Sequence, residues 1–374
     1  MMCFLNGFTI TTLFVLLISM PSCRNSQLDD VKSMKKIDVH MHIFSDEPSF
    51  RALLDEYNFK VNNLVTDADV LEPLTYNDQR EIALATCIEK PRLYSWVTTF
   101  GVEKRNEPDW AENVIKQLKE DFDNGALGIK VWKQIGMKIK HPDGRYIQID
   151  DPIFAPILEF IEKEGKTFIP HIGEPVQAWM LQRETDYWGK HPEWLMWDQP
   201  EKPSFNDCIA ALDHVIRRYP DLRIVGAHLA SLEFDVNEIS KRLDIYPNFA
   251  VEIGGRVRQL MWQPSGKVRH FMMTYQDRIM YGTDMFSPLV DKPGGTPSAE
   301  EIEKRTAKFI KRTNIFLRYL ATDDEFPWSD QIYDDEPAGE PTYVVSGLNL
   351  PKEVLYKIFY ENPKKWFPGI EKDY

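Results

Sequence analysis

The sequence has few cysteines, and none of them stands in a pattern that binds zinc or builds a disulfide framework. Only four occur in 374 residues, without a CxxC pair or a cysteine–histidine cluster. A finger-type zinc site or a disulfide-stapled scaffold is therefore not indicated. Cys87 and Cys208 lie in segments with helical patterns, which favours buried free thiols over a bridge between them.

The chain also lacks an excess of positive charge and the glycine-rich turns that hold phosphates. Its formal net charge is −13, which argues against nucleic acid or an anionic membrane surface as the main partner. No GxGxxG or GxxxxGK[ST] pattern follows a strand-like run, so dinucleotide-binding and P-loop folds are not predicted. The hydrophobic fraction of 43% instead indicates a folded chain with a sizeable core.

The first 23 residues differ from the rest. The apolar run at 8–20 has the length of a signal-peptide core rather than of a membrane span, although no Lys or Arg precedes it. "PSC" at 21–23 resembles a bacterial lipoprotein cleavage site. We therefore expect residues 1–23 to be a lipoprotein signal, Cys23 to carry the lipid, and 24–35 to be a linker. These features predict an exported protein of the periplasm or cell envelope. The alternative is that residues 1–23 form an ordinary anchor helix.

From residue 36 onward, short apolar runs alternate with amphipathic segments. Eight runs read as strands: 36–42, 59–65, 94–102, 126–133, 167–173, 223–230, 249–255 and 278–285. Strands separated by helices pair in parallel, and eight such units predict a closed (β/α)₈ barrel, or TIM barrel, over 36–368. We also expect an insertion after the fifth strand, at 176–206, and a C-terminal helical extension.

Ionisable side chains gather at the ends of these predicted strands. His40 and His42 are two apart, so in a strand they point to the same face. Burying isolated charges among Ile, Val and Met is costly, so a shared partner is expected. Imidazoles with a carboxylate suit zinc or a similar divalent ion. The residues at the strand ends are His40, His42, Lys130, His171, His228 and Asp284.

The order of these residues resembles the amidohydrolase superfamily. "HIGEP", "VGAHLA", "YGTDM" and "LPKEVLYKIFYENPKKWF" are similar to its amidohydrolase-related branch, which includes metal-dependent hydrolases and non-oxidative decarboxylases. The resemblance implies that one Zn²⁺ is bound by His40, His42, His171 and Asp284. Asp284 and His228 would be catalytic.

The resemblance leaves a second metal open. Lys130 occupies the strand-four position where some members carry a bridging carboxylated lysine, and His228 would then bind the second ion. The alternative for Lys130 is an amine that pairs with Asp284 or contacts substrate. Arg256 and Glu174 are the candidate substrate-binding residues, because both directly follow a predicted strand. A surface salt bridge is the alternative for Arg256. The remaining histidines are not expected to be ligands, namely His141, His191, His214 and His270.

Three functions are compatible with this site. The first is a hydrolase of a lactone, amide or ester of a small organic acid, which uses a metal-activated water. The second is a metal-dependent decarboxylase of a small unsaturated or aromatic acid. The third is a non-catalytic surface-binding lipoprotein. The expected partner is a small molecule, with membrane contact only through a lipid on Cys23, and homo-oligomerisation is left open.

Overall fold

The computed structural model describes residues 23–68, 73–181, 192–197, 199–327 and 344–374. Its barrel strands are β1 (Lys36–His42), β2 (Phe59–Leu64), β3 (Tyr94–Val97), β4 (Gly128–Val131), β5 (Thr167–Pro170), β6 (Arg223–Gly226), β7 (Phe249–Glu252), β8 (Ile279–Met280) and β9 (Met285–Phe286). A separate antiparallel pair joins β10 (Glu325–Pro327) to β11 (Val344–Ser346). These strands cover the eight runs expected from the sequence.

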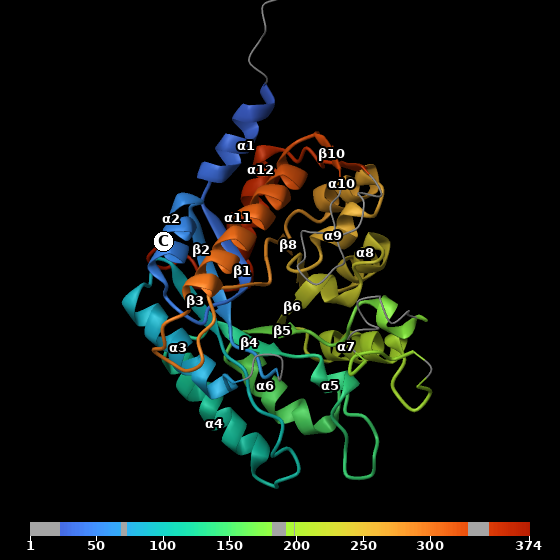
Figure 1. The fold of residues 1–374 in the computed structure, drawn as a ribbon. Helices are drawn as coiled ribbons and strands as arrows, with labels where there is room; N and C mark the ends of the chain where they lie inside the picture. Colours follow the sequence, from blue (N-terminus) through green and yellow to red (C-terminus); the bar gives the residue numbers. More distant parts are fainter. Residues whose placement is uncertain (1–22, 69–72, 182–191, 198, 328–343) are drawn as a thin grey trace, which may run out of the picture.

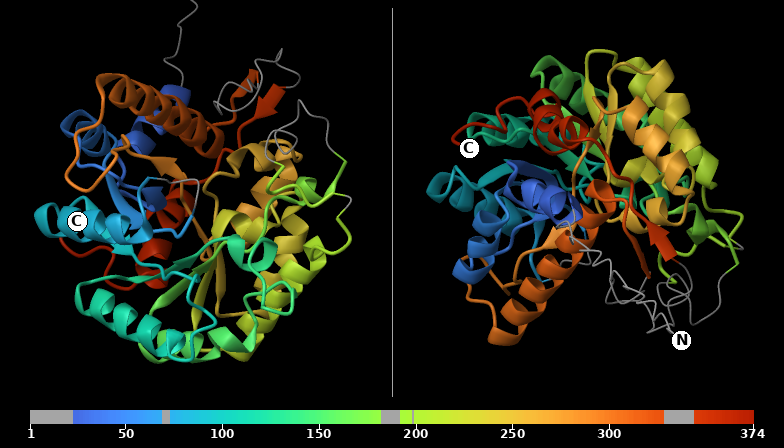
Figure 2. Two further views of the ribbon diagram at one scale, coloured as in Figure 1. Left: turned by 60° about the horizontal axis from the view of Figure 1, so that its bottom comes forward. Right: turned by 90° about the horizontal axis from the view of Figure 1, so that it is seen from above.

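Helices follow most barrel strands and form an outer ring around them (Figure 2, left). They are α1 (Cys23–Ser33), α2 (Pro48–Glu56), α3 (Tyr76–Glu89), α4 (Trp110–Asp123), α5 (Gln134–Met137), α6 (Ala155–Lys163), α7 (Phe205–Arg218), α8 (Val236–Ile245), α9 (Val257–Met261), α10 (Ser265–Thr274), α11 (Ala299–Ala321), α12 (Lys352–Tyr356) and α13 (Asn362–Trp366). Shorter turns are η2 (Pro152–Phe154), η3 (Val176–Trp179), η4 (Ala227–Ser231) and η6 (Lys357–Glu361).

The strands close into a (β/α)₈ barrel, which confirms the predicted fold. They form two parallel sheets, in the orders β3-β2-β1-β9 and β4-β5-β6-β7-β8. A parallel bridge between Thr98 and Ile129 joins the sheets on one side. On the other side, the backbone N–H of Val39 donates to Tyr281 O at 3.0 Å. The carboxyl ends of all strands therefore meet at one mouth.

The predicted eighth strand is interrupted. Residues 278–285 were expected as one run, but β8 ends at Met280 and β9 begins at Met285. Asp284, between them, has a left-handed backbone with φ of 57°, which a regular strand cannot contain. The break lets the chain leave β7 and pair with β1, and it places Asp284 at the mouth.

The C-terminal segment closes the opposite end of the barrel. Trp366, Phe367 and Ile370 pack against apolar side chains from strands all round the barrel, which can meet only inside it. The carbonyl of Trp366 accepts a hydrogen bond from Thr167, the first residue of β5. The side chain of Asn362 donates to Ile279 O at 2.7 Å, at the start of β8. These contacts explain why the long C-terminal helical pattern is amphipathic.

The N-terminal residues described by the structure are helical. Helix α1 occupies most of the segment expected to be a linker, and its Val31 is buried in the main core. Lys36 Nζ donates to Val31 O at 2.9 Å and to Lys32 O at 2.7 Å, which satisfies carbonyls at the end of the helix. Helix α1 lies beside α11 (Figure 1). Residues 1–22, which hold the expected signal, lie outside the described residues.

The insertion predicted after β5 falls partly outside the residues that the structure describes. The chain runs from the end of β5 at Pro170 to the start of α7 at Phe205, and residues 182–191 and 198 of this stretch are not described. The predicted insertion at 176–206 therefore stays a prediction. None of the described helices combines the length and apolar character needed to cross a membrane.

We predict that Trp366→Ala destabilises the whole barrel. Trp366 is buried in the barrel interior, so its truncation should lower the free energy of unfolding by about 3–5 kcal/mol. Urea unfolding followed by circular dichroism measures this change. Glu371→Ala is the control, because Glu371 is exposed on the same C-terminal segment and should change stability by less than about 0.5 kcal/mol. Equal unfolding midpoints for the two variants would contradict the role given to the segment.

Candidate metal centre

Three side chains from the first strand and from the loop that follows β8 converge at the mouth of the barrel. His40 Nε2 and His42 Nε2, from β1, each lie 3.4 Å from Oδ1 of Asp284, in the loop between β8 and β9. Two ligands bound tetrahedrally to one zinc ion at 2.0–2.2 Å lie roughly 3.3–3.6 Å apart. The arrangement therefore has the spacing of three ligands around one ion. The sequence analysis named all three as metal ligands, and the structure brings them together as potential ligands.

The hydrogen bond made by one ring nitrogen of each histidine leaves the other nitrogen to bind a metal. His42 Nδ1 donates to Leu64 O at 2.7 Å, and His40 Nδ1 donates to Glu252 Oε1 at 2.8 Å. Each ring therefore carries its proton on Nδ1 and presents the lone pair of Nε2 to Asp284. This is the pattern by which metal-binding histidines are oriented. The donor set fits a divalent ion.

Asp284 is held in place by contacts to β1. Its backbone N–H donates to His40 O at 2.7 Å. The preceding Thr283 donates from its N–H and its hydroxyl to the buried carboxylate of Asp38, at 3.1 Å and 2.5 Å. Burial raises the pKa of Asp38 to about 7, although these hydrogen bonds act to lower it. Gly255 leaves room for the carboxylate of Asp284, because a Cβ at position 255 would lie 2.8 Å from Asp284 Oδ2.

Asp284 differs from the histidines in exposure. Its side chain is 29% exposed, whereas those of His40 and His42 are almost fully buried. Burial acts to raise the pKa of Asp284, but the neighbouring His40 and His42 hold it below its usual range. Asp284 is therefore an ionised carboxylate that a substrate can reach.

Glu252 is the functional residue that the sequence reasoning missed. It ends β7 and is almost fully buried. Besides His40, it accepts the backbone N–H of His228 at 2.6 Å and that of Gly254 at 2.5 Å. Burial acts to raise its pKa, but the contact with His40 and these donors hold the pKa below the usual value. The signal was present, because Glu252 is an acidic residue at the end of an apolar strand run.

His171 and His228 form a second part of the site. The His228 ring lies 4.7 Å from that of His40 and 4.4 Å from that of His171, between centroids. His228 Nδ1 donates to Gly254 O at 2.7 Å, so its Nε2 carries the lone pair. The buried Nε2 of His171 has no hydrogen-bond partner among the described residues. Burial, together with nearby positive charge, holds the pKa of both rings well below the usual value.

The structure divides these groups into two clusters. Within the described part of the chain, His40, His42 and Asp284 form one group of potential metal ligands, and His40, His228 and Glu252 form another. His171 belongs to neither, although its ring contacts that of His228. Its role as a metal ligand stays a prediction, which its unpartnered nitrogen favours.

Lys130 extends from β4 into the same site. It is almost fully buried, and its Nζ lies 3.3 Å from His40 Nε2. Burial lowers the pKa of Lys130 to about 8, although the carboxylates of Glu252 and Asp284 act to raise it. The amine of Lys130 therefore lies beside a predicted ligand of the first ion, and its role as a second-metal ligand, like its pairing with Asp284, stays a prediction. Whether it is carboxylated stays a prediction.

The two predicted substrate-binding residues have different surroundings. Arg256 follows β7, its side chain is 13% exposed, and its Nε lies 3.7 Å from Oε1 of Glu233. Its positive charge acts on the pKa of both His171 and His228, so it lies near them. Glu174 is buried and forms an ion pair with Lys133. Substrate contact by either residue stays a prediction.

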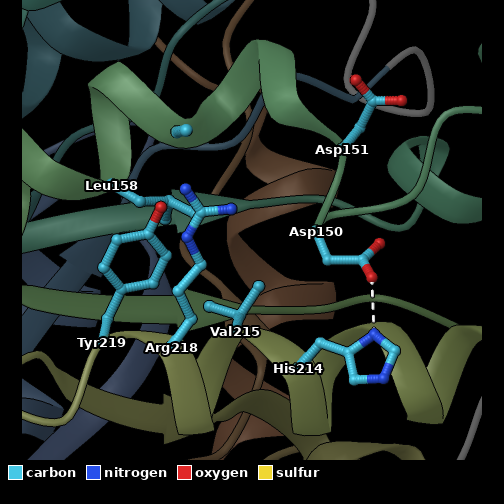
Figure 3. A pocket seen from close by; sticks show the side chains of 8 residues that line it. Asp150, Asp151, Leu158, His214, Val215, Arg218 and Tyr219 are labelled. Carbon is cyan, nitrogen blue, oxygen red and sulfur yellow. Dashed lines mark hydrogen bonds and ion pairs between the residues drawn. The ribbon is translucent and has the colours of Figure 1, made fainter.

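The histidines not expected to be ligands lie elsewhere where they are described. His214 Nδ1 pairs with Asp150 Oδ2 at 2.8 Å, at a pocket of about 190 Å³ that is lined by the residues just before η2 and by side chains of α6 and α7 (Figure 3). His141 pairs with Asp151, the residue after Asp150, at 2.7 Å. His270 is exposed. His191 lies outside the described residues.

Comparisons with known proteins agree with this geometry. A sequence profile of the family described as Amidohydrolase matches residues 37–369. An uncharacterized TIM-barrel protein from Bordetella bronchiseptica is similar in fold, with 14% identity and a TM-score of 0.50, over 91% of this chain and 100% of that one. A 2,6-dihydroxybenzoate decarboxylase from Rhizobium shows 12% identity and a TM-score of 0.50, over 89% and 98%. No curated protein matches the sequence.

We predict that Asp284→Asn and His42→Ala both weaken binding of Zn²⁺ by at least about ten-fold. Each change removes one of three converging donor atoms. Elemental analysis of the purified protein, with chelator competition for affinity, measures the effect. His214→Ala is the matched control, because that histidine pairs with a carboxylate far from the mouth. Wild-type zinc content in Asp284→Asn would show that this carboxylate is not a ligand.

A separate prediction concerns Glu252. Glu252→Gln cannot accept hydrogen bonds through both oxygens, so the orientation of His40 and of the His228 backbone should loosen. We expect metal affinity to fall about 10–100-fold, as for other groups that orient a ligand. Chelator competition measures the affinity, with Glu301→Gln on helix α11 as the control. Unchanged affinity would mean that the orientation of His40 does not depend on this carboxylate.

Proposed function

Because this chain belongs to the amidohydrolase family, we propose that it is a metal-dependent hydrolase. The substrate we propose is a lactone, amide or ester of a small organic acid. The observation that carries this proposal is the convergence of His40 Nε2, His42 Nε2 and Asp284 Oδ1 with 3.4 Å spacings at the barrel mouth.

The proposed cofactor is a single Zn²⁺, held by His40, His42, Asp284 and His171. A divalent ion in such a site lowers the pKa of a bound water and polarises a carbonyl oxygen. A second ion, held by Lys130 and His228, is the alternative. Support for it comes from Lys130 Nζ, which lies 3.3 Å from His40 Nε2.

The side chains of the site favour base chemistry. Hydrolysis requires a group that takes a proton from water and returns it to the leaving group. Asp284 is ionised and partly exposed, and its Oδ2 lies 4.0 Å from His228 Nδ1. The ring N–H of His228 is committed to Gly254 O, so His228 offers an acceptor nitrogen rather than a proton. We therefore assign proton transfer to Asp284, with His228 as the assisting acceptor.

The positive groups near the site favour an anionic substrate. Lys130 is buried beside His40, and Arg256 lies at the rim near His171 and His228. A guanidinium binds a carboxylate through two parallel hydrogen bonds. We assign a free acid group of the substrate, distinct from the lactone, amide or ester bond that is hydrolysed, to Arg256. Glu174 is the second proposed contact, and its ion pair with Lys133 would set its orientation.

Decarboxylation of a small unsaturated or aromatic acid is the second candidate. The Rhizobium decarboxylase shares the fold, and a carboxylate held between Arg256 and the metal centre suits this reaction as well. In this case the bond from the ring or vinyl carbon to the carboxyl carbon breaks and CO₂ leaves. A proton must then be delivered to that carbon. The Nδ1–H of His228 is committed to Gly254 O, so this ring offers no free proton for that step, and we place decarboxylation second.

Export as a lipoprotein, with the lipid on Cys23, remains part of the proposal. It rests on the apolar run at 8–20 and on "PSC" at 21–23. Residues 1–22 lie outside the described structure, and helix α1 begins at Cys23.

Product analysis separates the two candidate reactions. The zinc-loaded protein is incubated with a panel of lactones and esters of small acids and with a panel of hydroxybenzoates. A hydrolase releases a proton and no CO₂, which a pH indicator and a CO₂ assay detect together. We expect proton release, and CO₂ release from the hydroxybenzoates without hydrolysis of any lactone or ester would favour the second candidate.

We predict that Asp284→Asn lowers kcat by about 10²–10⁴-fold, which is the usual contribution of a positioned acid or base. The measurement is made at zinc concentrations that saturate the variant, so that loss of catalysis is separated from loss of metal. His214→Ala should retain wild-type turnover. Full turnover by metal-loaded Asp284→Asn would overturn the catalytic assignment.

A further inference from the structure

Glu233 is a fully buried acid within ion-pair distance of Arg256. It follows η4, in the connection from β6 to α8, and its side chain has no exposed surface. Neither of its carboxylate oxygens accepts a hydrogen bond from any residue described by the structure. A buried carboxylate without such partners is costly, so its retention calls for a charge that it offsets.

Arg256 lies within ion-pair distance of Glu233, and Arg258 is a second positive charge that acts to lower the pKa of Glu233. The distance from Arg256 Nε to Glu233 Oε1 is 3.7 Å, and Arg256 Nη1 donates to Gly255 O at 3.0 Å. The guanidinium is therefore hydrogen-bonded to a carbonyl through Nη1 and lies at ion-pair distance from a carboxylate, without a hydrogen bond between Nε and that carboxylate. The bond to Gly255 O uses Nη1 alone, so Nη2 is the donor that we assign to a ligand.

The restraint acts directly beside the metal site. Gly255, whose carbonyl holds Arg256, is so close to Asp284 that a Cβ on it would lie 2.8 Å from Asp284 Oδ2. The guanidinium also lies near enough to His171 and His228 for its charge to act on both rings. A carboxylate bound by Arg256 would thus stand next to the reacting centre.

We propose that Glu233 is a positioning residue, whose carboxylate holds Arg256 at the angle that binds the acid group of the substrate. The enzyme thereby prefers an anionic substrate to a neutral one of the same shape. This inference rests on the role given to Arg256 in the proposed function. It assigns to Glu233 no contact with the reacting atoms.

Binding of two matched probes tests the inference. The probes are 2-hydroxybenzoate and its uncharged analogue 2-hydroxybenzamide, titrated calorimetrically into the zinc-loaded protein. Wild type should bind the acid at least about ten-fold more tightly than the amide, because only the acid pairs with a guanidinium. Arg256→Gln should reduce this preference about ten-fold, because the glutamine side chain is neutral.

The Glu233 variants then isolate the new claim. Glu233→Gln keeps the shape of the side chain but removes its charge, and should reduce the acid-over-amide preference about ten-fold. Glu233→Asp, which keeps the charge, should retain part of the preference. Both variants should keep wild-type zinc content and amide affinity, which general damage to the fold would lower.

The outcomes test the positioning role of Glu233 separately from the substrate-binding role of Arg256. A wild type without preference, or an Arg256→Gln variant that keeps it, would overturn the role of Arg256 and the inference together. If Arg256→Gln loses the preference but Glu233→Gln keeps it, only the positioning role is wrong.

The double variant provides the last check, because Glu233→Gln should have no further effect once Arg256 is replaced. A further loss there would also overturn the inference. If Glu233→Gln does not fold, the comparison is made with Glu233→Asp, and an undiminished preference would overturn the inference.

Discussion

The structure of the site depends on the pairing of β1 with the loop between β8 and β9. The backbone N–H of Asp284 donates to His40 O at 2.7 Å, and Met41 and His42 pair with Met285 and Phe286. The same contacts close the barrel and bring the carboxylate to the two imidazoles. Closure and site assembly are therefore one event. A chain that failed to close here would lose both.

The site contains charged side chains of a kind that folded proteins usually leave exposed to solvent. Lys130, Glu252 and Glu233 are all buried, together with the histidines. Their mutual contacts offset part of the cost of burial, and a bound divalent cation and an anionic substrate would offset more. A cation and an anionic substrate thus account for the charged groups that gather at this mouth of the barrel.

Much of this could be predicted from the sequence, for reasons visible at particular residues. Parallel strands each need a crossover, so the alternation of apolar runs and helical patterns specified the barrel. His40, His42 and Asp284 were identifiable as polar residues at strand ends. Glu252 was missed although it has the same character, because it orients ligands and does not complete a familiar motif. The break before Asp284 was also missed, because its left-handed backbone depends on Asp38 and Thr283, far apart in the sequence.

The central claim is that one divalent ion is bound at the barrel mouth by groups from both ends of the chain. Anomalous diffraction at the zinc edge, from crystals of the zinc-loaded protein, tests it most directly. The account predicts an anomalous peak about 2.0–2.2 Å from His40 Nε2, His42 Nε2 and an oxygen of Asp284. Zinc bound elsewhere, with no peak between these three side chains, would contradict it.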